Sequence, residues 1–267
     1  NDSWRVDTPD GATLVLQRVN PLFPVAVNDD IDRLTRHLES RGVFTPRLVP
    51  TPQGGLTLVA SGAVWRLMSF VPGITRDVVE NDRQADEAGA LLARFHVALS
   101  DLEHSFVNAR PGVHDTPRHL EALRCALAEH AGHARFGEVA PLAEAILQIA
   151  AALPELPAAP DRIVHGDPKI SNVMFDELTD DGLCLIDLDT VGPMPVILEL
   201  GDAFRSWCNP RGEESRDAAF SVPLLRAATT GYAREARDFL SAQEWCCLPA
   251  ATLTVTVELA SAAKRAA

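Results

Sequence analysis

Lysine is almost missing from this 267-residue chain, because only Lys169 and Lys264 occur and arginine carries the other permanent positive charges. Positive charge is scarce as a whole, since 24 lysines and arginines stand against 37 acidic residues and the formal net charge is −13. Such a chain cannot neutralise phosphates along an extended surface, so the charge balance excludes a nucleic-acid-binding protein. A lone lysine in the middle of the chain therefore draws attention to the segment around Lys169.

The chain also lacks a disulfide framework and a membrane span. Its five cysteines are an odd number without the spacing of a disulfide scaffold or a zinc site, and Cys246 and Cys247 are adjacent. We expect free thiols, mostly buried, in a reducing compartment. No apolar run approaches the roughly twenty residues that a bilayer requires, and no basic-then-apolar leader opens the chain. These absences predict a cytoplasmic protein without a membrane partner.

The first part of the chain is predicted to be small and rich in β-structure. The expected elements are strands at 13–19, 56–60 and 64–70 and one helix at 29–41. The sequence Val71-Pro72-Gly73 ends the last of these strands, because proline followed by glycine interrupts regular structure. We therefore predict one domain over residues 1–71 and a second, larger domain over residues 72–267.

Helical periodicity dominates the larger domain. Its expected helices are 83–101, 118–129, 141–153, 198–207, 224–240 and 253–267. The segment 141–153 consists almost entirely of alanine and aliphatic residues, so we expect it at the centre of the core. A small β-rich part followed by a mainly helical part with a few short strands predicts an α+β fold with two lobes.

Between the helices lies a segment, 163–189, with the sequence IVHGDPKISNVMFDELTDDGLCLIDLD. Two short apolar runs in it are each bordered by acidic or amide side chains. Asp167 precedes the first run together with Lys169 and Asn172, and Asp187 ends the second. Oxygen-bearing side chains at the ends of short strands can hold a metal ion and a reacting hydroxyl in fixed positions. Phosphoryl transfer requires this arrangement.

Each of these side chains has a suitable role in phosphoryl transfer. Asp167 can orient and deprotonate an acceptor hydroxyl, and Lys169 can extend beside it toward a γ-phosphate. Asn172 and Asp187 provide hard oxygen ligands of the kind that Mg²⁺ accepts, with phosphates and water in the remaining positions. The spacing of aspartate, lysine at plus two and asparagine at plus five, followed by a later strand that ends in aspartate, matches the catalytic and metal-binding loops of protein kinases.

Longer stretches carry a more specific resemblance. The sequences HGDPKISNVMFD, LCLIDLDTVGPMP and LELGDAFR resemble the aminoglycoside phosphotransferase and choline kinase superfamily, which has a protein-kinase-like fold. The segments LVLQRVN, WRLMSFVPG, GALLARFH and GVHDTPRHLEAL are similar to the N-acetylhexosamine 1-kinase group within it. This resemblance covers most of the chain. It implies an ATP- and Mg²⁺-dependent kinase for a small molecule.

The resemblance also implies roles for individual residues. Asp167 would be the catalytic base, and Asn172 and Asp187 would bind Mg²⁺. The hinge between the lobes would run from Met68 to Val71, with backbone groups of Ser69 and Val71 on adenine. The cation that kinases place on a strand near the phosphates would be Arg18, or Gln17 would take that position if the register is one residue earlier. Further acidic residues of the family correspond to Asp189 and Asp202.

The sequence departs from the family pattern at three places. The glycine-rich phosphate loop of the family would precede Asn1, so we expect the small domain to lack its first strands. The helix glutamate that pairs with the strand cation has no clear counterpart, since Glu39 comes late on its helix. Glu199 stands where the hexosamine kinases tend to have aspartate.

Several residues have a structural interpretation beside the functional one. Asp167 could be a turn residue, and Asp189 could belong either to the site or to the loop. His96 is expected to be a hydrogen-bonded core histidine. Arg205 could meet the substrate, although we favour an ion pair with Asp202. His114, in the segment similar to the sugar kinases, is a candidate for either substrate binding or loop stabilisation.

The sequence therefore predicts a kinase that transfers the γ-phosphate of ATP to a sugar hydroxyl. The favoured acceptor is an N-acetylhexosamine at its anomeric hydroxyl. An aminoglycoside or a choline-type amino alcohol is the alternative acceptor, because an acidic cleft suits a cation. A nucleotide-binding pseudokinase is a third hypothesis, motivated by the missing glycine loop and helix glutamate. The complete set Asp167, Asn172 and Asp187 argues against it.

Overall fold

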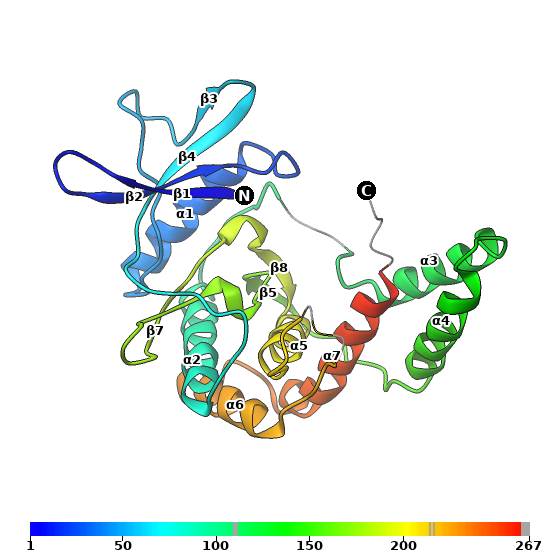
Figure 1. Cartoon of the computed structure of the whole chain (residues 1–267). Helices are drawn as coiled ribbons and strands as arrows, with labels where there is room; N and C mark the ends of the chain where they lie inside the picture. The colour runs from blue at the N-terminus through cyan, green and yellow to red at the C-terminus, as the bar shows by residue number, and fades with distance from the viewer. Residues whose placement is uncertain (109–111, 214, 216, 263–267) are drawn as a thin grey trace.

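The computed structural model describes residues 1–108, 112–213, 215 and 217–262, and it shows two lobes of unequal size (Figure 1). The small lobe contains an antiparallel sheet with one helix against it, and the large lobe is mainly helical. This is the two-lobed α+β arrangement that the sequence predicts. No helix within these described ranges is long and apolar enough to cross a membrane.

The sheet of the small lobe has the strand order β1-β2-β4-β3, with antiparallel neighbours throughout. Its strands are β1 (Asp2–Asp7), β2 (Thr13–Arg18), β3 (Leu58–Ala60) and β4 (Ala63–Ser69). A tight turn with Gly11 at φ +88° joins β1 to β2, as the Pro9-Asp10-Gly11 sequence favours. The register places Gln17 of β2 directly opposite Arg66 of β4, so these two side chains share one face of the sheet.

Helix α1 (Val27–Ser40) packs its expected apolar face inward, since Ile31, Leu34 and Leu38 are all buried. It begins two residues earlier than predicted, and Asp30 of its first turn is buried rather than exposed. The carboxylate of Asp30 accepts the backbone N–H of Val107 at 2.9 Å and lies 2.7 Å from His104 Nε2. The helix is thereby joined to the segment that follows α2 of the large lobe.

The core of the large lobe is built on four helices: α2 (Asp82–Ala98), α5 (Val196–Trp207), α6 (Val222–Ala236) and α7 (Ala242–Ser261). Helices α2 and α6 approach each other closely because glycines stand at their contact. A Cβ on Gly89 would lie 2.1 Å from the carbonyl oxygen of Ala228, and a Cβ on Gly231 would lie 1.9 Å from that of Asp86. Helix α7 begins eleven residues before the predicted start at Leu253, at a capping box of Ser241 and Glu244.

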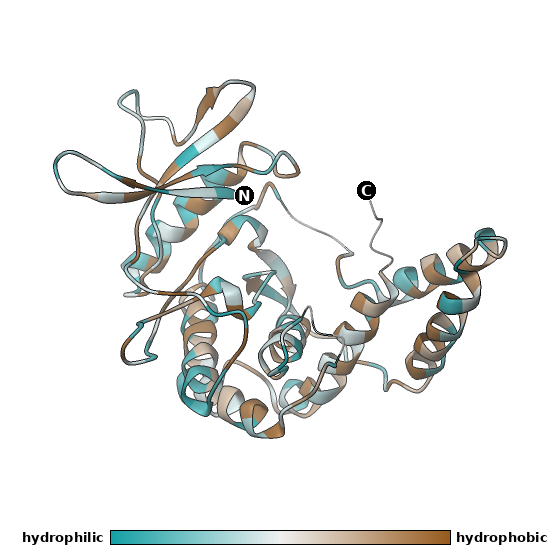
Figure 2. Cartoon of the chain, viewed as in Figure 1, coloured by the Kyte–Doolittle hydropathy of each residue, from teal (hydrophilic) through white to brown (hydrophobic). Residues whose placement is uncertain are grey.

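Helices α3 (Thr116–Glu129) and α4 (Phe136–Ala151) form a hairpin that projects from the large lobe beside α7 (Figure 1). The prediction that 141–153 lies at the centre of the core is wrong, because Ala143 is the single buried residue of α4. Its apolar side chains Val139, Leu142 and Ile149 are exposed. Much of this helix has the brown colour of hydrophobic residues (Figure 2). An apolar composition favours a helix that can be buried, but the helices α2, α5, α6 and α7 already fill the core.

Four short strands of the large lobe carry the motif of the 163–189 segment. They are β5 (Asp161–Val164), β6 (Val173–Phe175), β7 (Gly182–Leu185) and β8 (Gly192–Pro195), paired as β5 with β8 and β6 with β7. The cysteines are free, as predicted, but only Cys184 and Cys208 are buried. The predicted end of the last helix, at 263–267, lies outside the described residues.

Candidate active site

The loop between β5 and β6, residues 165–172, is held in one conformation by contacts on both of its sides. Gly166 has φ +79°, and a Cβ there would lie 2.3 Å from the carbonyl oxygen of Thr190. Only glycine fits this close approach to the backbone. The hydroxyl of Thr190 donates to the carbonyl of His165 at 2.9 Å, and His165 Nε2 lies 2.9 Å from the carbonyl oxygen of Ile186. The loop is thus fixed against the segment that follows β7.

A buried carboxylate supports the same loop from the other side. Glu199 on α5 accepts the backbone N–H groups of His165 at 2.8 Å and Gly166 at 2.7 Å. His96 of α2 lies 3.0 Å from Glu199 and 2.8 Å from the hydroxyl of Tyr232 on α6. Burial opposes the ionisation of Glu199, but the hydrogen bond and charge of His96 outweigh it and lower the pKa of this carboxyl. The prediction that His96 is a hydrogen-bonded core histidine is confirmed.

Asp167 projects from this loop with its carboxylate partly open to solvent. Lys169 Nζ lies 3.0 Å from Asp167 Oδ2, and the amide nitrogen of Asn172 donates to the same oxygen at 3.1 Å. The amide nitrogen also donates to the backbone carbonyl of Asp167 at 2.8 Å. Because its nitrogen faces Asp167, the side-chain oxygen of Asn172 points away from Asp167.

Asp187, directly after β7, has a left-handed backbone with φ +62° and ψ +57°. Such a conformation is uncommon for a residue other than glycine, and it is found preferentially where a side chain must take a defined direction. Burial raises the pKa of Asp187, and the nearby charges of Asp189 and Asp167 act in the same direction. A cation beside Asp187 would relieve this repulsion.

Asp189 differs from Asp187 although only Leu188 separates them. Its side chain is 1% exposed and forms two hydrogen bonds with the guanidinium of Arg66, at 2.6 and 2.8 Å. Burial opposes ionisation here too, but the hydrogen bonds and charge of Arg66 outweigh it, and the pKa of Asp189 is lowered. Asp189 therefore has a fixed counterion within the protein. Asp187 accepts a hydrogen bond from Asn1 Nδ2 at 3.3 Å, has the carboxylates of Asp189 and Asp167 near it, and forms no ion pair within the described residues.

The donor set suits a divalent cation of the magnesium type. Asn172 and Asp187 supply an amide and a carboxylate oxygen, both hard ligands. Within the described ranges, no cluster of three or more histidine, cysteine or acidic side chains has the geometry of a metal site. Mg²⁺ is commonly bound through one or two protein ligands together with phosphates and water, so the two oxygens of Asn172 and Asp187 suffice for it.

A cavity between the lobes, here called the interlobe pocket, has a volume of about 330 Å³. Asn172 and Asp187 lie on its wall together with Gln17 and Arg66. Its apolar lining comes from both lobes and includes Val15, Ile31, Met68, Val71, Met174 and Ile186. An apolar slot that adjoins hard oxygen ligands can take a flat ring with an attached phosphate chain.

The expected hinge residues Met68, Ser69 and Val71 line this interlobe pocket. The backbone N–H of Ser69 donates to the carbonyl of Arg47 at 2.8 Å, so that group is already paired. The structure does not bring Arg18 to this pocket. Arg18 is exposed and paired with Asp2, whereas Gln17 lines the pocket. Successive side chains of a strand point to opposite faces of the sheet. A shift of one residue in the predicted register therefore decides whether Gln17 or Arg18 faces the pocket.

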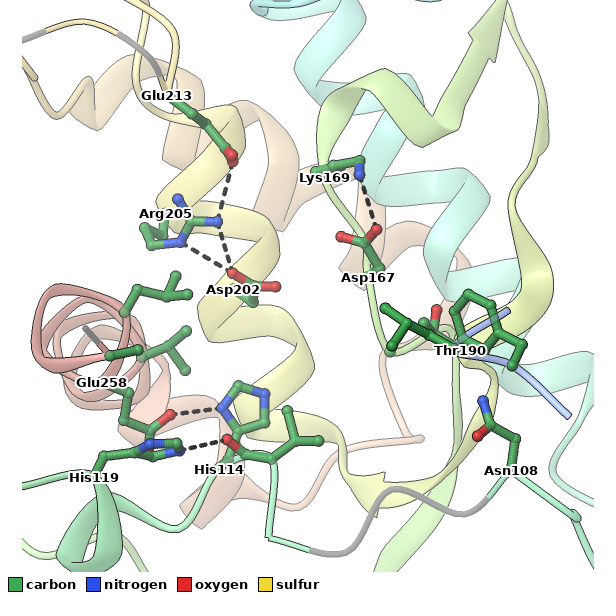
Figure 3. Close-up of a pocket in the computed structure, with 17 residues that line it drawn as sticks. Asn108, His114, His119, Asp167, Lys169, Thr190, Asp202, Arg205, Glu213 and Glu258 are labelled. Atoms are coloured by element: carbon green, nitrogen blue, oxygen red, sulfur yellow. Dashed lines mark hydrogen bonds and ion pairs between the residues drawn. The ribbon is translucent and has the colours of Figure 1, made fainter. Parts of the chain in front are cut away.

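A second cavity, here called the Asp167 pocket, lies on the other side of the loop and has a volume of about 630 Å³. Asp167, Lys169 and Thr190 border it from the loop side, and Asp202, Arg205 and Glu213 face them (Figure 3). The predicted ion pair is present, since Arg205 Nη2 lies 2.9 Å from Asp202 and 3.0 Å from Glu213. Burial nevertheless outweighs Arg205 and raises the pKa of Asp202.

His114 forms part of the lower wall of the Asp167 pocket in Figure 3. Its Nδ1 lies 2.6 Å from the carboxylate of Glu258 on α7, and that carboxylate also accepts the hydroxyl of Thr116 at 2.5 Å. Glu258 is 3% exposed, so this carboxylate fixes the orientation of the histidine ring. Because Nδ1 faces Glu258, Nε2 on the opposite edge of the ring is directed away from that carboxylate.

The structure therefore divides the predicted site residues between two pockets. The interlobe pocket contains Met68, Ser69, Val71, Asn172 and Asp187, and the Asp167 pocket contains His114, Asp167, Lys169, Asp202 and Arg205. Neither cavity is lined by Asp189 or Arg18.

Sequence reasoning missed Arg66 and Glu258, and it noted Glu199 only as a departure from the family. An arginine inside the apolar run WRLMSF and a glutamate inside the largely apolar stretch LTVTVELA of α7 are the signals that could have identified the first two.

Comparisons with known proteins show the family and the fold of the chain. The family model APH, described as "Phosphotransferase enzyme family", matches residues 1–237. Among solved structures, amicoumacin kinase hAmiN in complex with AMP-PNP, Ca²⁺ and Ami has a TM-score of 0.65 at 13% identity, over 96% of this chain and 76% of that chain.

Two further structures are similar. An aminoglycoside phosphotransferase from Alicyclobacillus acidocaldarius has a TM-score of 0.64 at 16% identity, over 98% of this chain and 80% of that one. A microcompartment-associated aminopropanol kinase has 0.61 at 17% identity, over 97% and 79%. Identities this low show the shared fold, and the family model shows the relationship. The chain belongs to the phosphotransferase enzyme family and is a phosphotransferase that acts on a hydroxyl group of a small molecule.

Proposed function

We propose that the enzyme transfers the γ-phosphoryl group of ATP, with Mg²⁺, to a sugar hydroxyl, and that the acceptor is an N-acetylhexosamine at its anomeric hydroxyl. The observation that carries this proposal is the position of Asp167 and Asn172. The two side chains are hydrogen-bonded to each other, yet Asp167 lines the Asp167 pocket and Asn172 lines the interlobe pocket. An acceptor in one pocket and a nucleotide in the other would meet at this pair.

Asp167 is the base in this proposal. The acceptor oxygen forms a bond to the γ-phosphorus, the bond from that phosphorus to the β–γ bridging oxygen breaks, and the acceptor proton passes to the Asp167 carboxylate. Lys169, 3.0 Å from this carboxylate, adds positive charge beside the transferred group. ADP is the leaving group.

Asn172 and Asp187 would hold the magnesium ion with their side-chain oxygens. A bound Mg²⁺ neutralises negative charge on the phosphate chain. The left-handed backbone of Asp187 directs its carboxylate, and the hydrogen bonds from Asn172 to Asp167 direct the amide. Both ligands are therefore oriented before any ion binds.

The apolar part of the interlobe pocket would take the adenine ring. Val15, Met68 and Met174 can contact its faces, and backbone groups of Ser69 and Val71 can contact its edge. Strand β4 ends at Ser69, and α2 begins at Asp82. We therefore keep Val71 as the last residue of the nucleotide-binding small domain and assign residues 72–267 to the acceptor-binding domain.

The charges of the Asp167 pocket favour a neutral acceptor. Its carboxylates already have partners within the protein: Asp167 has Lys169, Asp202 and Glu213 have Arg205, and Glu258 has His114. A sugar offers many hydroxyl groups to such paired carboxylates, and the apolar Leu22, Phe23 and Val255 can cover a sugar ring. Hexose-sized molecules also fit a volume of about 630 Å³.

An amino-containing acceptor is the alternative. The pocket has four carboxylates, Asp167, Asp202, Glu213 and Glu258, against two permanent cations, Lys169 and Arg205. The structurally similar proteins include an aminoglycoside phosphotransferase and an aminopropanol kinase. A protonated amine would compete for these carboxylates with the cations of the protein.

A screen of ATP consumption decides between these acceptors. The purified enzyme would be incubated with ATP and Mg²⁺ and with N-acetylglucosamine, N-acetylgalactosamine, other hexoses, aminoglycosides, choline or ethanolamine. We expect turnover with an N-acetylhexosamine, and phosphorus NMR should show an anomeric phosphate. Turnover restricted to the amines would overturn the sugar proposal, and nucleotide binding without turnover of any acceptor would favour the pseudokinase hypothesis.

A further inference from the structure

Arg66 of β4 is a buried arginine with partners in both lobes. Its side chain is 1% exposed, as is that of Asp189, and the two make a bidentate ion pair at 2.6 and 2.8 Å. Its Nε donates to Gln17 Oε1 at 2.8 Å, and its Nη1 reaches Asn28 Oδ1 at 3.3 Å. A guanidinium has five N–H groups in a rigid plane. The four contacts with Asp189, Gln17 and Asn28 therefore fix both the position and the orientation of the Arg66 guanidinium.

The pair joins the two lobes at the wall of the interlobe pocket. Arg66, Gln17 and Asn28 belong to the small lobe, whereas Asp189 follows β7 in the large lobe. Arg66 itself lines the interlobe pocket, and so do Asp187 and Leu188, the two residues directly before Asp189. A bidentate arginine–carboxylate pair specifies distance and angle together, so the relative placement of the sheet and the 187–190 segment follows from it.

The pair also separates the tasks of two neighbouring aspartates. Both carboxylate oxygens of Asp189 contact Arg66, and Asn1 Nδ2 donates to Oδ2 at 2.5 Å. These oxygens are directed at the protein, whereas Asp187 faces the interlobe pocket. A ligand in the interlobe pocket would therefore contact the carboxylate of Asp187 and not that of Asp189.

We propose that Arg66 and Asp189 are a positioning pair, which sets the small lobe on the 187–190 segment and so presents Asp187 to the nucleotide and its metal ion. This inference rests on the proposed function of the interlobe pocket as the nucleotide site. It assigns Asp189 to the support of a metal ligand and not to the metal itself. It also places the buried positive charge of the small lobe on β4, one strand away from the expected Arg18.

Four variants test the pair: Arg66→Met, Arg66→Lys, Asp189→Asn and the double variant Arg66→Met with Asp189→Asn. Arg162→Met is the matched control, because Arg162 makes a bidentate pair with Glu244 at 2.6 and 3.2 Å within the large lobe. The measurements are the Kd of a fluorescent ADP analogue with Mn²⁺, the Kd of Mn²⁺ by electron paramagnetic resonance, and kcat and KM for ATP. Thermal unfolding shows which variants are folded.

We expect Arg66→Met and Asp189→Asn each to weaken binding of the Mn²⁺–nucleotide about 10–100-fold, the usual range when a partner behind a metal ligand is lost. The double variant should lose less than the product of the two single losses, because the interaction is already broken in each single variant. Arg66→Lys should lie between wild type and Arg66→Met, since an ammonium cannot make the bidentate contact. Arg162→Met should leave both dissociation constants unchanged.

Asp187→Asn provides the second comparison. It should abolish measurable Mn²⁺ binding in the nucleotide complex, whereas Asp189→Asn should weaken it. Equal loss in both variants would overturn the inference, because Asp189 would then be a ligand. Additive losses in the double variant, or losses no larger than that of Arg162→Met, would also overturn it.

If Arg66→Met does not fold, Arg66→Lys and Asp189→Asn decide the matter. A wild-type protein that binds no nucleotide would instead refute the proposed function.

Discussion

The two pockets on either side of the Asp167–Asn172 contact are built in different ways. The interlobe pocket is the smaller, about 330 Å³ against about 630 Å³, and its wall is mainly apolar. Most of its lining comes from β2 and β4 of the small lobe and from the 172–188 segment of the large lobe. The Asp167 pocket collects polar side chains from α5, α7 and the loops after α2 and α5. Both walls collect residues from separate parts of the chain, but one wall is mainly apolar and the other carries most of the charged side chains.

This difference indicates which of the two pockets determines the choice of acceptor. A site that accepts one common nucleotide needs a flat apolar slot and a few oxygen ligands. A site that selects one acceptor among many small molecules needs hydrogen-bonding groups whose positions come from distant parts of the chain. Substitutions should therefore affect one pocket at a time, except at the contact between them.

The largest effect is expected at that contact. Asp167→Asn should lower kcat by about 10²–10⁴-fold, because the acceptor hydroxyl loses its base. The KM for ATP should change less than kcat, because Asp167 does not line the interlobe pocket and reaches it only through its hydrogen bond with Asn172. Steady-state kinetics with the acceptor identified by the screen checks this. Unchanged kcat would remove Asp167 from the mechanism.

A smaller effect confined to the Asp167 pocket is expected from Glu258→Gln. The charged hydrogen bond that holds His114 becomes a neutral one, and we expect the KM for the acceptor to rise about tenfold. The KM for ATP should stay the same. Glu121→Gln, an exposed position on α3, is the control. A rise in both constants would show that the two pockets are not independent.

The reverse pattern is expected from Met174→Trp in the interlobe pocket. Met174 is buried and lines that pocket, so a larger ring should reduce the space for adenine and raise the KM for ATP about tenfold. The KM for the acceptor should not change. An increase in the acceptor KM alone would place the nucleotide elsewhere.

The smallest effect is expected from Glu244→Gln, which lies outside both pockets. The hydrogen bond from Arg162 lowers the pKa of Glu244 below its ordinary 4.5, so the carboxylate stabilises the fold above that pH. This contribution is lost as the pH falls through the lowered pKa. The melting temperature of the variant should therefore lie below that of the wild type at pH 7, and the gap should shrink below about pH 4.5. A gap that is constant with pH would contradict the charge contribution.

The sequence predicts contacts between residues that are close along the chain better than contacts between residues that are far apart. Asp167, Lys169, Asn172 and Asp187 lie within one segment, so their spacing alone indicates where they meet. The apolar face of α1 follows equally from local periodicity. Arg18 was misplaced because a strand reverses the direction of its side chains at each residue, and a local pattern does not tell which face is covered.

Long-range partners could not be predicted in the same way. Arg66 and Asp189 are 123 positions apart, and His114 and Glu258 are 144 apart. The apolar neighbours of Arg66 in the sequence indicate a buried arginine, but nothing near it identifies Asp189 as its partner. Helix α4 shows the opposite error, since its apolar composition suggested burial although other helices occupy the core. The composition of a segment shows that it can be buried. It does not show whether the rest of the fold leaves an apolar surface for that segment to cover.

The support behind Gly166 has a consequence for how such an enzyme can change over generations. Glu199, His96 and Tyr232 hold the loop from the interior, on α5, α2 and α6. His114 and Glu258, by contrast, stand on the opposite wall of the Asp167 pocket and make no contact with this chain of hydrogen bonds in the described part of the structure. Inherited substitutions in that outer wall can therefore accumulate while the reacting groups keep their places. A lineage can acquire a new acceptor without rebuilding its chemistry.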